Sequence, residues 1–236
     1  MKFLLLSPER LKADRSAIAF ILAVSILCIG IVILLHFGQD VSIGKLTRDL
    51  STIAKVPLYI GFLSQIGIFF WSAAIAICIY TAKLISRRPN TRIIRRFFFA
   101  SGLLTLLLSL DDAFMLHESF FPSVGIPEKL VFVSYAGLVF LYLARFYSTI
   151  LKTEYIFLGI ALLFFGLSIS CDYFKPRWED LSLLKDGYLL EDGAKFIGIV
   201  SWLTYLYRSA LLAVYQNTPQ QDAALDDNSP MLYSRR

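Results

Sequence analysis

Long apolar runs separated by short polar segments dominate the pattern of this 236-residue chain. No Lys, Arg, Asp or Glu interrupts residues 16–39 or 56–82. As helices, both runs are long enough to cross the ~30 Å hydrocarbon core of a bilayer. The same pattern predicts six membrane-spanning helices, at about 16–37, 57–83, 96–117, 130–151, 155–173 and 189–213. The predicted fold class is therefore an all-α, polytopic membrane helix bundle.

The distribution of Lys and Arg predicts the orientation of this bundle. Fifteen of these bases fall on the side that carries both termini, and seven fall on the other side. The positive-inside rule then predicts that both termini are cytoplasmic, in a multi-pass protein of the plasma (inner) membrane. The expected organisation is a cytoplasmic N-terminal segment over 1–15, a six-helix transmembrane domain over 16–215 and a disordered cytoplasmic tail over 216–236, which is polar.

Composition agrees with a membrane protein and excludes two other classes. Hydrophobic residues make up 57% of the chain and charged residues 17%, whereas soluble domains carry about 25% charged residues. The net charge of +5 does not indicate a nucleic-acid partner, because the bases cluster beside the apolar runs. Three cysteines, of which two lie in apolar runs, do not indicate a disulfide framework. The expected partner is the lipid bilayer, with no nucleic acid.

The third apolar run ends in the acidic sequence Asp111-Asp112-Ala-Phe-Met-Leu-His117-Glu118. Its apolar part, Phe97–Leu110, covers only ~21 Å as a helix, so the spanning helix must continue into the acids. Carboxylates inside a membrane are costly and rare, and they indicate a functional site. If the helix is continuous, Asp111 and Glu118 lie on one face of it.

Two further polar clusters are predicted to meet the same outer leaflet. The fifth span ends there at Asp172, and the sixth begins there with Glu191, Asp192 and Lys195. The apolar run after Lys195 is short, so this ammonium group lies below the interface and needs a carboxylate partner. Three carboxylates are candidates for this partner: Asp111, Asp112 and Glu191.

The outer cluster has many more acids than bases, so we expect it to bind a divalent cation or a proton. Carboxylates and an imidazole suit a hard or borderline divalent cation. The candidate metal ligands are Asp111, His117, Glu118 and Asp172. The candidate catalytic residues are Asp111, Asp112, Glu118, Glu191, Asp192 and Lys195.

Three classes of function agree with such a site. The leading hypothesis is a metal-assisted enzyme acting on a lipid or lipid-linked substrate. The alternatives are a small cation- or proton-coupled transporter and a non-catalytic assembly or interaction partner of another membrane protein. A transporter needs polar groups that continue toward the cytoplasmic side, and the sequence offers few in the apolar runs: Ser64, Gln65, Ser72 and Thr105.

Overall fold

The structure is a computed structural model that describes residues 8–57, 59–85, 91–178 and 188–217. Within these ranges every regular element is a helix, which confirms the all-α prediction. The chain forms two compact units that divide between Ile60 and Gly61.

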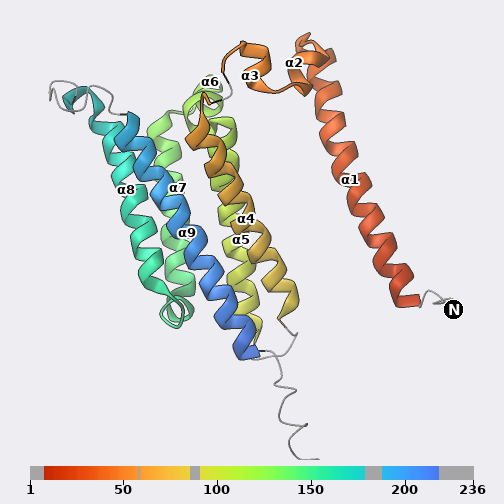
Figure 1. Ribbon diagram of the computed structural model, residues 1–236, viewed down its shortest axis with the longest axis vertical. Helices are drawn as coiled ribbons and strands as arrows, with labels where there is room; N and C mark the ends of the chain where they lie inside the picture. Colours follow the sequence, from red (N-terminus) through yellow and green to blue (C-terminus); the bar gives the residue numbers. More distant parts are fainter. Residues whose placement is uncertain (1–7, 58, 86–90, 179–187, 218–236) are drawn as a thin grey trace, which may run out of the picture. The chain divides into compact units, whose positions relative to one another are not determined.

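The first unit consists of one long helix and two short ones (Figure 1). Helix α1 spans Pro8–Gln39 and therefore begins inside the predicted N-terminal segment. Proline suits this position, because the first helical N–H has no partner within the helix. From Ile18 to Gln39 the helix is strongly apolar. Helices α2 (Ile43–Thr47) and α3 (Leu50–Ala54) follow.

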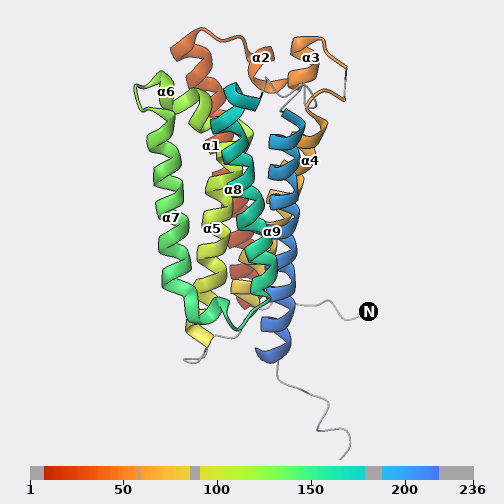
Figure 2. The same ribbon diagram turned by 90° about the vertical axis from the view of Figure 1, so that its left-hand side faces the viewer.

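The second unit is a bundle of long helices with a short reversal between α5 and α7 (Figures 1 and 2). Its long helices are α4 (Phe62–Leu84), α5 (Arg92–Phe114), α7 (Glu128–Ile150), α8 (Tyr155–Trp178) and α9 (Tyr188–Asn217). The reversal consists of the π-helix η2 (Leu116–Phe120) and the single turn α6 (Phe121–Ser123). The most extensive contacts join α8 to α9, α4 to α5, and α4 to α9.

Five described helices are long and apolar enough to cross a membrane, namely α1, α4, α5, α7 and α9. In α8 the apolar part, Tyr155–Cys171, is shorter, and the side chains from Asp172 to Tyr188 lie outside the described ones. These helices indicate an integral, multi-pass membrane protein. Helix α9 continues to Asn217, two residues beyond the predicted end of the membrane domain, and residues 218–236 lie outside the described chain.

The core of the bundle is rich in aromatic side chains. Phe97 and Phe98 of α5 and Trp202 and Tyr205 of α9 are at most 1% exposed. Phe97 also packs edge-on against Phe146 of α7. Burial of such large side chains brings α5, α7 and α9 together and fixes which faces of these helices point inward.

The packing of α8 on α9 depends on Gly198. A Cβ atom at this position would lie 2.7 Å from the ring of Phe165, which is too close for two carbon atoms. The ring has little freedom to move, because it stacks on Trp71 and contacts Trp202. We expect Gly198→Ala to lower the free energy of unfolding by about 1–3 kcal/mol, measured by denaturation in detergent. Gly193→Ala on the same helix is the control, since its Cβ meets no atom within 4 Å. Equal stability of the two variants would contradict this account.

Candidate functional site

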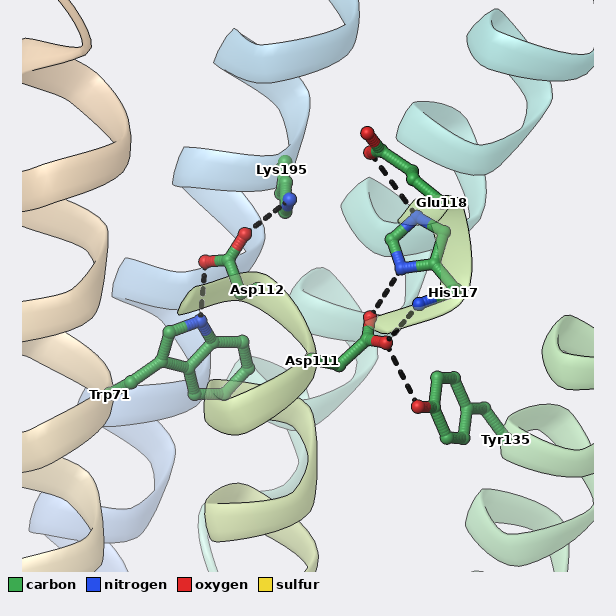
Figure 3. A network of polar contacts seen from close by, with 7 residues as sticks. All are labelled: Trp71, Asp111, Asp112, His117, Glu118, Tyr135 and Lys195. Atoms are coloured by element: carbon green, nitrogen blue, oxygen red, sulfur yellow. Dashed lines mark hydrogen bonds and ion pairs between the residues drawn. The ribbon is translucent and has the colours of Figure 1, made fainter. Parts of the chain in front are cut away.

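The candidate site forms where α5 ends and the chain reverses (Figure 3). Met115 adopts a left-handed backbone with φ of 49°, and its N–H donates to the carbonyl of Asp111. A left-handed residue stops a right-handed helix, although this position is usually taken by Gly or Asn. The prediction that the third helix continues to residue 117, with Asp111 and Glu118 on one face, is therefore wrong.

The reversal places three donors around the carboxylate of Asp111, whose side chain is 10% exposed. Its Oδ1 accepts hydrogen bonds from the backbone N–H of His117, at 3.0 Å, and from the hydroxyl of Tyr135, at 2.9 Å. Its Oδ2 lies 2.5 Å from Nδ1 of His117. Asp111 thus fixes both the backbone and the ring of His117. Tyr135 of α7 donates the third hydrogen bond to the Asp111 carboxylate.

The imidazole of His117 lies between two carboxylates. Nδ1 faces Asp111, and Nε2 lies 3.4 Å from Oε1 of Glu118. The His117 side chain is 12% exposed and that of Glu118 is 55% exposed. Burial alone lowers the pKa of His117, but the hydrogen bond and charge of Asp111, with the charge of Glu118, outweigh burial and raise it above the usual value. This setting favours the imidazolium, which donates from both nitrogens.

The second carboxylate, Asp112, joins three helices. It forms an ion pair with Nζ of Lys195 on α9, and its Oδ2 accepts a hydrogen bond from the indole N–H of Trp71 on α4, at 3.1 Å. The side chain of Asp112 is 7% exposed and that of Lys195 is 35% exposed. The prediction that Lys195 has a carboxylate partner is confirmed, and of the three candidates this partner is Asp112.

Two clusters therefore arise from two consecutive residues. We call them the Asp111 cluster (Asp111, His117, Glu118 and Tyr135) and the Asp112 cluster (Asp112, Lys195 and Trp71). Successive side chains of a helix point about 100° apart. Asp111 consequently faces η2 and α7, whereas Asp112 faces α4 and α9 (Figure 3).

The remaining predicted site residues lie around the start of α9. Asp192 is exposed, and its charge acts on Lys195, as does that of Glu118. Glu191, in the first turn of α9, is half-buried. The side chain of Asp172, predicted as a metal ligand, lies outside the described residues.

The contacts do not gather the described metal-ligand candidates around one point. Asp111 and Glu118 approach opposite nitrogens of the His117 ring, so the ring separates the two carboxylates. Across the described ranges, no three His, Cys, Asp or Glu side chains form a group that could hold a metal ion.

Sequence reasoning missed two residues of the site, Trp71 and Tyr135. Both are aromatic residues with a polar donor inside apolar runs, and this pattern is also typical of residues at the membrane interface. Trp71 and Tyr135 donate to the two carboxylates because α4 and α7 pack beside α5. A single sequence does not directly indicate which helices pack together.

Buried polar pairs continue through the core of the bundle away from the two clusters. The indole of Trp202 donates to the hydroxyl of Thr105 at 2.9 Å. Farther along α5, the hydroxyls of Ser101 and Tyr142 lie 2.8 Å apart. Of the four polar residues that the sequence analysis named in the apolar runs, Thr105 belongs to these pairs. The other members of the pairs are Trp202 and Tyr142, which were counted as apolar, and Ser101, which was not considered.

Comparison with known proteins gives one match. A family model described as Domain of unknown function (DUF8692) matches residues 17–209. All residues of the Asp111 and Asp112 clusters fall inside the matched range. No curated protein and no solved structure matches the chain.

Proposed function

This chain belongs to the family described as Domain of unknown function (DUF8692), and we propose a function for it. In this proposal the protein is a proton-coupled membrane transporter that takes up and releases protons at the Asp111 cluster. The observation that carries the proposal is a continuous series of titratable contacts. It leads from Glu118, whose side chain is 55% exposed, through His117 to the buried Asp111 and on to Tyr135. Such a series connects the aqueous phase with the end of the helix bundle.

The chemistry follows from the two faces of the imidazole. A histidine that loses a proton from one nitrogen and regains it at the other passes a proton across its ring. Glu118 is placed to exchange protons with water and with Nε2. Asp111 is placed to hold the proton on Nδ1, because it is oriented by Tyr135 and by the backbone of the reversal.

The buried polar pairs support a route beyond the cluster. Hydroxyl and indole groups give the core donors and acceptors at Thr105–Trp202, Ser101–Tyr142 and Thr153–Tyr205. Hydroxyls both donate and accept, so protons can move along them with water between the pairs. If the two clusters only fixed helix packing, these additional polar pairs in the core would not be needed.

The proposed arrangement in the membrane has six spans, with α8 as the fifth span of the chain and both termini in the cytoplasm of a plasma (inner) membrane. The asymmetry of 15 against seven bases supports this orientation. The Asp111 and Asp112 clusters then face the outside, where protons enter.

A second candidate function is acid–base catalysis on a lipid or lipid-linked substrate. The observation in its favour is that Asp111 binds both the ring and the backbone N–H of His117, as a residue does when it orients a general base. The two functions can be distinguished by what is measured: a transporter moves protons across the membrane, whereas an enzyme converts a lipid.

The test is proton flux in vesicles that contain the purified protein and a pH-sensitive dye. We expect the protein to relax an imposed pH gradient and His117→Gln to reduce this flux to that of protein-free vesicles. His36→Gln is the matched control, because His36 is the other histidine of the chain and bonds to the carbonyl of Val41. Equal flux in His117→Gln and wild type would contradict the proposal. Lipid conversion without proton flux would favour the enzyme.

A further inference from the structure

A cavity of about 190 Å³ lies at the other end of the bundle from the Asp111 and Asp112 clusters. Its walls come from the first turns of α5, the last turns of α9 and the connection between α7 and α8. Phe97, Phe98 and Leu212 make part of its wall apolar, and Lys152 and Gln216 line it with polar groups. It therefore offers an apolar interior beside a polar rim.

One polar side chain inside the cavity is left without a partner. Ser209 is fully buried, and its hydroxyl makes no hydrogen bond within the described part of the chain. The nearby hydroxyl of Tyr205 lies 3.1 Å from the hydroxyl of Thr153 and pairs with it. By contrast, Ser101 and Thr105 each donate to the carbonyl four residues earlier on their helix. A buried hydroxyl without a partner is unfavourable, and a polar group in the cavity would satisfy it.

The surroundings of the cavity are basic. Lys152 lines it directly and is exposed at the α7–α8 connection. Arg92 and Arg96 stand on the same turns of α5 that form the wall, and both are exposed. The nearby acid, Glu154, is already paired with Arg208 at 2.9 Å. The local charge thus favours an anionic ligand.

We propose that this cavity binds the headgroup of an anionic phospholipid. The phosphate lies beside Lys152, a headgroup oxygen meets the Ser209 hydroxyl, and the adjoining apolar stem contacts Phe98 and Leu212. The cavity lies at the ends of helices that are long enough to cross a membrane, and the ends of such helices reach the headgroup region of a bilayer. Basic pockets between helix ends are a recognised setting for such headgroups. Free phosphate shares the charge but has no stem to fill the apolar part.

The test is native mass spectrometry of the full-length protein in detergent, with equal amounts of phosphatidylglycerol and phosphatidylcholine. We expect preferential retention of phosphatidylglycerol. Lys152→Gln should weaken it roughly fivefold. Lys83→Gln, at an exposed lysine in the last turn of α4 outside the cavity lining, should leave it unchanged. Equal retention of the two lipids, or equal effects of the two variants, would overturn the proposal.

Ser209→Ala separates binding from a structural role. Removing a buried, unpaired hydroxyl should leave the lipid-free protein as stable as wild type or more stable, while it weakens retention of phosphatidylglycerol. Loss of stability without loss of lipid would show that Ser209 is structural and contradict the proposed contact. Inorganic phosphate is the last arm: if it displaces phosphatidylglycerol at equal concentration, the site binds the free ion and the lipid proposal is wrong.

Discussion

Lys195→Met is expected to lower the free energy of unfolding by about 3 kcal/mol, because it leaves the Asp112 carboxylate without a counter-charge. Asp112 is 7% exposed, so water cannot replace the lost ammonium group. Methionine keeps an unbranched side chain of nearly the same length but carries no charge. The hydrogen bond from Trp71 remains and does not neutralise the carboxylate. Denaturation in detergent measures the difference.

The double variant Asp112→Asn with Lys195→Met provides the control for this prediction. It removes both charges together, so most of the stability should return. Lys83→Met, at an exposed lysine of α4, should change stability by no more than about 0.5 kcal/mol. A coupling energy near zero in the double-mutant cycle would show that the ion pair contributes nothing to the fold.

Asp111→Asn is expected to lower the pKa of His117 and to remove a pH-dependent part of the stability. In the wild type the folded state raises this pKa above its usual value. The stabilisation is therefore fully present below the unfolded pKa of about 6.5 and is lost as the pH rises through the folded pKa. Asparagine still accepts hydrogen bonds at Oδ1 but carries no charge. We expect the variant to lose about 2 kcal/mol at pH 6 and less at pH 9.

Two measurements check this result. Histidine ring resonances report the pKa directly, and the chain contains only His36 and His117, so His36→Gln assigns them. Unfolding at pH 6 and pH 9 gives the stability of wild type and variant, and their difference removes the contribution of other titrating groups. An unchanged His117 pKa in Asp111→Asn would mean that the Asp111 cluster does not control this proton.

The apolar runs of the sequence predicted the long helices, because a bilayer requires lengths and compositions that few other structures share. The need to neutralise a base below the interface likewise predicted an acid beside Lys195. The end of α5 was not predictable in this way. Met115 stops the helix without the Gly, Asn or Pro that usually marks such a stop. The bonds formed after the reversal, from the backbone and ring of His117 to Asp111, stabilise this end of the helix.

The sequence also could not predict whether Asp111 or Asp112 is the partner of Lys195. The choice depends on the rotation of α5 about its own axis, which is set by the burial of Phe97 and Phe98 in the core. A rotation of about 100° would turn Asp111 to the side that Asp112 faces. Sequence spacing gives the angle between neighbouring side chains, but the packing of the whole helix decides which neighbour faces α9.

The placement of Asp111 and Asp112 on consecutive residues has a consequence for how α5 tolerates changes in length. Inserting or deleting one residue between Phe98 and Asp111 rotates the end of the helix by about 100°. Both carboxylates then turn from the neighbouring helices in a single step, Asp111 from Tyr135 of α7 and Asp112 from Lys195 of α9, whereas His117 follows Asp111. Substitutions in this stretch act one contact at a time. A change of length breaks the interhelical contacts of both carboxylates at once, so the number of residues here is constrained more tightly than their identity.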